Sequence, residues 1–248
     1  GQHLNKLNNP DEGVFYTSGR TSNEAAFLYQ LFVRSFGTNN LPDCSNMCHE
    51  SSGVALTETI GIGKGTVKLE DFYNTYLIII AGQNPGTNHP RMLSALKTAK
   101  ANGAQIIAVN PLKEAGLMNF SDPQSPIDLL GRYTQLSDLY LQVKINADLF
   151  LFKALAKILF MWEEEGGNII NKDFITNHTH GYTELKDSLK NYDLDELITN
   201  SGLTKDEVFL AADKIAKSKK IILCWAMGWT QHVNAVEVIQ EGVNLLLL

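Results

Sequence analysis

Short apolar runs alternate along the chain with stretches that carry apolar residues at helical spacing. Runs of this kind predict strands at Val14–Ser18, Tyr76–Ala81, Gln105–Val109, Leu139–Val143 and Lys220–Trp225. The last four are continuously apolar rather than alternating. This pattern is typical of parallel strands that are covered on both faces.

The segments between these runs predict helices. The first, Thr21–Phe36, opens on Thr21-Ser22-Asn23-Glu24, which has the pattern of a capping box, and Gly37 is its expected stop. Further helices are predicted at Pro90–Ala101, Asp148–Glu165, Tyr182–Lys190, Leu194–Thr199 and Thr204–Ala216. Strands that alternate with helices predict the α/β class, with a doubly wound, mostly parallel sheet flanked by helices.

Two segments depart from this alternation. Residues 38–68 are rich in Gly, Ser, Thr and Asn and predict a long irregular loop around a short helix, and loops of this length are usually functional. The apolar run at 243–248 has no residue that would cap a helix. We therefore expect the 248 residues to be a piece of a longer polypeptide.

The composition of the chain narrows the classes of partner and cellular compartment that we expect. The net charge is -6, with 27 acidic against 21 basic residues, which disfavours nucleic acid as a partner. Three cysteines are too few for a disulfide framework and favour a reduced, cytoplasmic protein. No apolar run reaches the roughly 18 residues of a membrane span, and the polar start is not a signal peptide.

Candidate chemistry gathers where the predicted strands end. Ligands of a doubly wound sheet lie beyond the carboxyl ends of its strands. The segments there are Ser18–Arg20, Gly82–His89, Asn110–Lys113, Lys144–Asp148 and Ala226–His232. Most of them carry Gly or Asn beside hydrogen-bonding side chains, which suits phosphate or pyrophosphate. Any one of them alone is explained as a turn. The glycine patterns of ordinary dinucleotide and P-loop sites are absent from the sequence.

The loop cysteines leave alternatives open. Cys44 and Cys48 are four residues apart, and His49 follows directly. A structural zinc site would need a second pair of ligands, and His178 and His180 have no cysteine near them. Both cysteines could instead be small buried apolar residues. A thiolate beside an imidazole also suits a metal ligand or a nucleophile. Cys224, inside an apolar run, predicts core packing.

These segments occur in an order that resembles a known family. The motifs are Tyr16–Glu24, Gly37–Asn40, Cys48-His49, Gly82–Pro90 and Trp225–Gln231. Together they resemble the alpha subunits of molybdopterin-dependent oxidoreductases of the dimethyl sulfoxide reductase superfamily, and among these the formate dehydrogenase-like clade. The resemblance extends over nearly the whole chain.

The resemblance implies a molybdenum or tungsten ion held by two molybdopterin guanine dinucleotides. It implies that Cys48 is the protein ligand of the metal and that His49 is the neighbouring proton-handling histidine. The residues that it implies hold the dinucleotides are Arg20, Gly82, Gln83, Asn84, Gly86, Thr87, Asn88, Asn110, Lys113, Asn146, Asp148, Met227, Gly228 and Gln231. It further implies a small-molecule substrate, a redox acceptor and an electron-transfer partner subunit.

The resemblance also divides the chain. Residues 1–40 are expected to end a preceding α/β domain, 41–70 to form the metal-ligand loop, and 71–248 to form a Rossmann-like domain that binds the guanine dinucleotide. A 4Fe-4S domain would precede this segment. Because the cofactor cage would then be incomplete, the chain alone is expected to be inactive.

Two departures and one alternative accompany this interpretation. Glu50 stands where formate dehydrogenases have Gly, which adds a negative charge beside the metal and opposes formate as the substrate. Asn110 replaces an acid that contacts ribose. The alternative function is a cofactor-free Rossmann-like scaffold of a respiratory-complex-like protein, against which Cys48-His49 argues.

Overall fold

The computed structural model describes residues 1–18, 21–42 and 48–248, which divide into two compact units. The first unit is Gly1–Ser51 and the second is Ser52–Leu248. The boundary between them falls inside the segment 41–70 that the sequence marks as a separate loop.

The first unit is built around one long helix. Its elements are η1 (Leu4–Lys6), η2 (Pro10–Glu12) and α1 (Asn23–Phe36). Ser22 begins α1 by accepting a hydrogen bond from the backbone N–H of Ala25, and Gly37 ends it with a φ of 105°. The predicted stop is confirmed. The predicted capping box is wrong, because the cap is Ser22 rather than Thr21.

The segment Val14–Ser18, predicted as a strand, has no strand conformation in the described part of the first unit. Phe15 of this segment packs edge-on against three rings of α1, those of Tyr29, Phe32 and Phe36. Its buried ring therefore covers a helix, whereas Val14 and Tyr16 are exposed. A strand prediction fails here because the described part of this unit offers no neighbouring strand to complete a ladder.

Four parallel strands form the sheet of the second unit. They lie in the order β5–β2–β1–β6, with β1 at Leu77–Ala81, β2 at Gln105–Val109, β5 at Leu139–Leu141 and β6 at Ile221–Trp225. In the middle of β1, Ile79 pairs with Ile107 and with Leu223. Every residue of β1 is buried, as expected for a strand that is covered on both faces.

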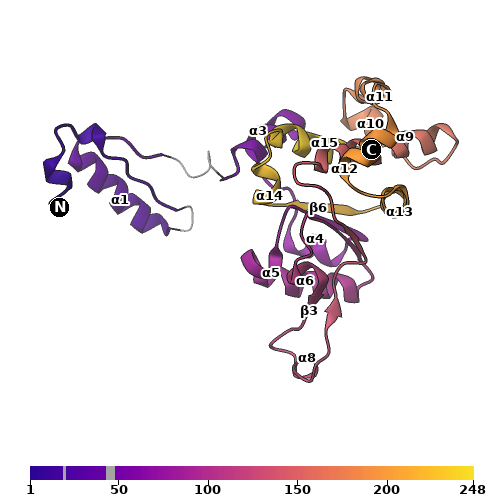
Figure 1. Cartoon of the computed structure of the whole chain (residues 1–248), viewed down its shortest axis with the longest axis horizontal. Helices are drawn as coiled ribbons and strands as arrows, with labels where there is room; N and C mark the ends of the chain where they lie inside the picture. Colours follow the sequence, from indigo (N-terminus) through magenta and orange to yellow (C-terminus); the bar gives the residue numbers. More distant parts are fainter. Residues whose placement is uncertain (19–20, 43–47) are drawn as a thin grey trace. The chain divides into compact units, whose positions relative to one another are not determined.

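Helices cover both faces of this sheet (Figure 1). Ile78 and Ile80 of β1 point into a core that contains residues of α6 (Pro90–Ala101). The alternate residues of β1 point into the larger core with α9 (Asp148–Glu164), α13 (Lys205–Ala216) and α15 (Ala235–Leu247). The predicted fold class, a parallel sheet flanked by helices, is confirmed.

The remaining elements are mostly short. The other helices are α3 (Glu50–Ile60), α4 (Leu69–Tyr73), α5 (Pro85–Asn88), α7 (Ala115–Met118), α8 (Pro126–Leu129), α10 (Lys172–His178), α11 (Tyr182–Lys190), α12 (Leu194–Ser201) and α14 (Met227–Thr230). An antiparallel ribbon joins β3 (Asn119–Phe120) to β4 (Thr134–Gln135). Sequence patterns did not predict α15, α10 or this ribbon, and they also missed the short helices α4, α5, α7, α8 and α14. In the part of the chain that the structure describes, no helix has the length and apolar character for a membrane crossing.

Candidate functional site at the carboxyl edge of the sheet

The strand order reverses between β1 and β6, which is the point where a doubly wound sheet binds its ligand. β1 has β2 on one side and β6 on the other, and all three run parallel. The loops that follow β1 and β6 are joined, because the N–H of Gly228 donates a hydrogen bond to the carbonyl oxygen of Gly82 at 2.9 Å. Two of the predicted cofactor segments therefore meet at this edge.

Both positions of this junction require glycine. Gly82 has a φ of 57°, and a Cβ built on it would lie 2.9 Å from the carbonyl carbon of Gly228. A Cβ built on Gly228 would lie 2.5 Å from the Cα and the carbonyl oxygen of Gly82. Real Cβ atoms do not approach other atoms this closely. Any larger residue must push the two loops apart.

A second glycine pair joins the next loops along the edge. Gly86 in α5 meets Gly116 in α7, and a Cβ on Gly86 would lie 2.7 Å from the Cα of Gly116. Asn84 begins α5 by accepting a hydrogen bond from the N–H of Thr87 at 3.1 Å. The side chains of Thr87 and Asn88 are exposed. In this loop, then, the glycines and Asn84 shape the backbone, and the exposed residues can contact a ligand.

Gln83 is buried, with 8% of its surface exposed. Its Nε2 atom lies 3.2 Å from Nδ1 of His89 and 3.4 Å from the sulfur of Met92. Its Oε1 atom is buried and has no hydrogen-bond partner among the described residues. Leaving a buried acceptor unsatisfied costs about 1–3 kcal/mol. The loop after β1 therefore carries an acceptor that a further donor would stabilise.

The loop after β2 is closed by its own first residue. The side-chain Nδ2 of Asn110 donates to the carbonyl oxygen of Leu112 at 2.7 Å, and its backbone N–H donates to Leu141 at 3.1 Å. Lys113 is exposed. Asn110 thus shapes this loop, and Lys113 presents a positive charge on its outside.

The loop after β5 supports the loop after β6. Asn146 has a φ of 62°, and its Oδ1 accepts a hydrogen bond from the N–H of Val233 at 3.3 Å. Asp148 is 3% exposed, and its Oδ1 accepts from Nε1 of Trp229 at 2.8 Å. Burial raises the pKa of Asp148, although the Trp229 hydrogen bond acts in the opposite direction. Asp148 is an interior support rather than a surface carboxylate.

The segment that follows Trp229 has polar atoms inside and an apolar side chain outside. Nε2 of His232 lies 3.7 Å from Oδ2 of Asp148, and only 10% of the His232 side chain is exposed. Nδ1 of His232 and Oδ1 of Asn234 are buried, with no hydrogen-bond partner in the described part of the chain. Val233, between them, is fully exposed. Met227 and Gln231, which were predicted to contact the cofactor, are exposed.

The predicted metal ligand lies in the first unit. Cys48 is half-buried and His49 is exposed, and both come directly before α3. Arg20 and Cys44 lie outside the described residues. Across residues 1–18, 21–42 and 48–248, no three His, Cys, Asp or Glu side chains gather into a metal-binding group. Cys224 packs against the α6 core as predicted, and burial raises the pKa of its thiol to about 12.

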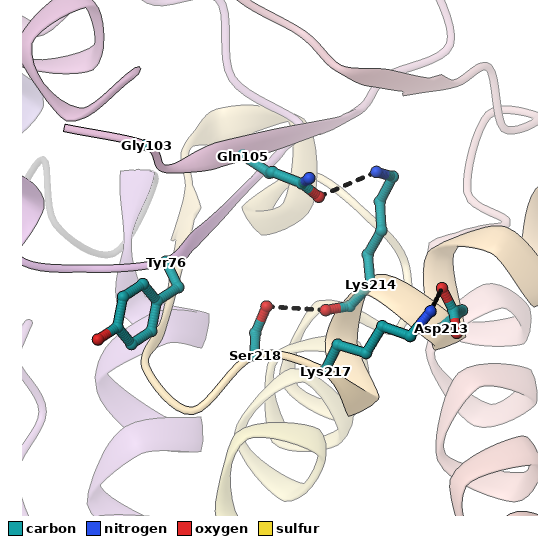
Figure 2. Close-up of a pocket in the computed structure, with 7 residues that line it drawn as sticks. All are labelled: Tyr76, Gly103, Gln105, Asp213, Lys214, Lys217 and Ser218. Atoms are coloured by element: carbon teal, nitrogen blue, oxygen red, sulfur yellow. Dashed lines mark hydrogen bonds and ion pairs between the residues drawn. The ribbon is translucent and has the colours of Figure 1, made fainter. Parts of the chain in front are cut away.

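A pocket of about 390 Å³ lies at the opposite, amino-terminal edge of the sheet (Figure 2). Its lining residues are Tyr76, Gly103, Gln105, Asp213, Lys214, Lys217 and Ser218. Nζ of Lys214 donates to Oε1 of Gln105 at 2.9 Å, and Nζ of Lys217 lies 2.7 Å from Oδ2 of Asp213. Each ammonium group in this pocket already has a partner. The pocket does not coincide with the predicted cofactor segments.

A family model described as molybdopterin oxidoreductase matches residues 2–248. This chain belongs to the molybdopterin oxidoreductase family. Its structure is similar to that of acetylene hydratase from Pelobacter acetylenicus, with a TM-score of 0.70 and 19% identity over 95% of this chain and 29% of that one. The resemblance inferred from the ordered motifs is confirmed, and so is the fold.

Two curated relatives extend the comparison within the molybdopterin oxidoreductase family. An uncharacterized oxidoreductase of Mycobacterium tuberculosis is 52% identical over all of this chain and 32% of its own length. The alpha subunit of an F420-dependent formate dehydrogenase of Methanocaldococcus jannaschii is 26% identical over 96% of this chain and 32% of its own length. The chain therefore spans about a third of the length of the curated relatives that it matches.

Sequence reasoning did not single out three polar residues at this edge of the molybdopterin oxidoreductase chain, although one of them, His232, ends a segment that it selected. They are Tyr140, Gln142 and His232, each of which contacts a loop or residue of the candidate site. Tyr140 and Gln142 alternate with the fully buried Leu141, so a period of two was the signal that could have found them. His232 carries no such signal, because its burial depends on the fold of the whole edge.

Proposed function

We propose that this chain is part of the catalytic subunit of a molybdenum oxidoreductase that resembles formate dehydrogenase. In this proposal it supplies Cys48 as the protein ligand of the metal and one edge of the site for bis-molybdopterin guanine dinucleotide. The observation that carries the proposal is the Gly82–Gly228 junction at the switch point of a chain from this family. Tungsten is the alternative metal.

The residues of the carboxyl edge fit a dinucleotide. Glycines at the switch point let the loops after β1 and β6 pack closely together, so that both can border one ligand at this edge of the sheet. Thr87, Asn88 and Gln231 are exposed hydrogen-bonding groups, and Lys113 offers charge to a phosphate. The Oε1 atom of Gln83 is an acceptor without a donor, and guanine carries N–H donors. The donors, acceptors and charge at this edge thus match the parts of a guanine dinucleotide.

Cys48 and His49 suit the remaining chemistry. A thiolate is a soft ligand, of the kind that a redox-active metal binds strongly. The bound cofactor would supply the electron-transfer chemistry. His49 is exposed beside Cys48, and histidine is the side chain that most often serves as a general acid or base. Cys48 would hold the metal and His49 would move the proton.

The substrate is a small molecule, and Glu50 bears on which one. Its carboxylate follows Cys48-His49 directly and disfavours an anion such as formate by charge repulsion. The formate dehydrogenase relative is only 26% identical, so its substrate need not be shared. Electrons would pass to a redox acceptor or to a partner subunit in the cytoplasm. The 248-residue chain alone is expected to hold no stoichiometric molybdenum and to be inactive.

The deciding experiment compares three variants of the full-length enzyme for activity and metal content. Cys48→Ser should abolish or greatly reduce turnover, because a hydroxyl is a harder and far less acidic donor. Cys44→Ser is the matched control and should cost much less. His49→Ala should keep the metal and slow proton transfer, since acid–base groups contribute about 10²–10⁴-fold.

Full activity and normal metal content in Cys48→Ser would contradict the ligand assignment. In that event the alternative, a cofactor-free scaffold domain, becomes the better account. Loss of metal in Cys44→Ser but not in Cys48→Ser would instead assign the ligand to the other cysteine.

A further inference from the structure

Tyr140 of β5 and Gln142, the residue that directly follows β5, hold the loop between β2 and α7. The hydroxyl of Tyr140 accepts a hydrogen bond from the N–H of Glu114 at 3.3 Å and donates one to the carbonyl oxygen of Leu112. Nε2 of Gln142 donates to the carbonyl oxygen of Pro111 at 2.9 Å. The backbone polar groups of this loop are therefore paired with side chains of the neighbouring strand.

The sheet register places these two side chains beside the loop. β5 pairs with β2 so that Tyr140 stands opposite Ala108, two residues before the loop begins at Asn110. Gln142 is two residues beyond Tyr140 and so projects to the same face of the strand. The ring of Tyr140 packs against the α6 core, and burial raises the pKa of its phenol. The hydroxyl therefore stays protonated and can keep donating to the loop.

The loop itself has no helical or strand structure to hold it. Residues 110–114 are irregular, and α7 starts only at Ala115. Within the loop, the side chain of Asn110 donates a hydrogen bond to the carbonyl oxygen of Leu112. From the neighbouring segment, Tyr140 and Gln142 donate hydrogen bonds to the carbonyl oxygens of Leu112 and Pro111. Leu112 and Lys113, which lie at its tip, are exposed.

We propose that Tyr140 and Gln142 are positioning residues of the nucleotide site, which hold the loop 110–114 so that Lys113 meets a phosphate of a guanine dinucleotide. This inference rests on the proposed function, because it assumes that the carboxyl edge binds that ligand. Neither side chain touches the ligand. Their contribution is to order the loop before binding, which removes an entropy cost that the ligand would otherwise have to offset.

The test uses Tyr140→Phe, which removes the hydroxyl and keeps the ring. Proton exchange at the Glu114 amide, followed by NMR, should speed up because its acceptor is gone. Affinity for GDP, measured by chemical-shift titration, should fall by about 2- to 10-fold, the value of one hydrogen bond. Gln142→Leu should weaken GDP binding in the same direction. Tyr76→Phe, at the opposite edge of the sheet, is the matched control and should change neither quantity.

A double substitution separates positioning from general stability. Lys113→Ala should weaken GDP binding by itself. If Tyr140 acts through the loop that presents Lys113, then adding Tyr140→Phe to Lys113→Ala should cost less than it does in the native chain. Equal costs in both backgrounds would show that Tyr140 acts independently of Lys113 and would overturn the proposal.

The other outcomes are also decisive. Faster exchange at Glu114 with unchanged GDP affinity would mean that Tyr140 holds the loop but does not serve the site, and unchanged exchange would mean that Tyr140 does not hold the loop. Either result overturns the positioning role and leaves the proposed function standing. No GDP-dependent shifts at the carboxyl edge of the native chain would instead reject the nucleotide site, and the positioning role with it.

Discussion

The two edges of the sheet in the second unit differ in how their polar groups are satisfied. At the amino-terminal edge, a pocket of about 390 Å³ is lined by two lysines that each have a hydrogen-bonding partner, Asp213 for Lys217 and Gln105 for Lys214. At the carboxyl edge, three buried polar atoms lack a hydrogen-bond partner among the described residues. They are Oε1 of Gln83, Nδ1 of His232 and Oδ1 of Asn234.

This difference teaches that an open volume is a weaker sign of a ligand site than unsatisfied buried polarity. Native proteins satisfy nearly all buried polar groups, so a cluster of exceptions needs an explanation. The exceptions follow β1 and β6, the two strands at which the sheet order reverses. In the pocket at the other edge, the ammonium group of Lys217 is paired with Asp213 and that of Lys214 donates to the amide oxygen of Gln105.

The largest effect is expected where the two glycine loops touch. Gly228→Ala should destabilise the fold by about 2–4 kcal/mol, because the new methyl group would overlap the backbone of Gly82. Gly103→Ala, at the opposite edge, is the control. It has a φ of 96° but no atom within 4 Å of its Cβ, and should cost about 1–2 kcal/mol. Urea unfolding of both variants checks the ranking, and equal losses would contradict the close junction.

A smaller effect concerns pH and Asp148. Burial raises the pKa of this carboxyl, so the stability linked to its neutral form is fully present below the ordinary value of 3.8 and is lost as pH rises through the raised value. Asp148→Asn keeps an acceptor for Trp229 and removes the charge. Its unfolding free energy should therefore fall less than that of the native chain as pH rises from 3.8 toward neutrality.

Thermal unfolding of both proteins across this pH range measures the difference. Parallel pH profiles for Asp148→Asn and the native chain would mean that folding does not raise the pKa of the Asp148 carboxyl group.

The smallest effect is expected from the charged residues of the pocket. Lys217→Ala removes an exposed ion pair with Asp213 and should change stability by less than about 0.5 kcal/mol. GDP binding should be unaffected, since Lys217 lies at the edge away from the proposed nucleotide site. A marked loss of GDP affinity in this variant would contradict a nucleotide site at the carboxyl edge and would place GDP binding in the pocket at the amino-terminal edge.

Much of the fold could be predicted from local patterns. The runs at β1, β2 and β6 are apolar without interruption because both faces of the sheet are covered, and Pro90 marks the start of α6. Val14–Ser18 has a similar composition and is not a strand. The ring of Phe15 in this segment packs on α1. Whether an apolar segment packs against a helix or pairs with a strand is decided by tertiary contacts, which local sequence patterns do not reveal.

The candidate site could be predicted as a set of loops but not as a set of roles. The strand-end rule selected the loops that contain Asp148 and Asn110, and the resemblance implied that both residues hold the dinucleotide. The structure adds that Asp148 is buried against Trp229 and that Asn110 is bonded within its own loop. The exposure of these side chains and their hydrogen bonds depend on how loops that are distant in the sequence pack together, and composition does not reveal that packing. The metal ligand and the cofactor contacts stay predictions.

The Gly82–Gly228 junction has a consequence for biosynthesis. β6 is made after the other three strands of this sheet, yet it pairs with β1, and a hydrogen bond between Thr75 and Lys220 spans 145 positions of the chain. At about 5–20 residues per second, the ribosome completes β6 on the order of ten seconds after β1. During that interval β1 has an open edge and the loop after it has no counterpart. A ligand that needs both loops can therefore enter only after β6 has been made and has paired with β1.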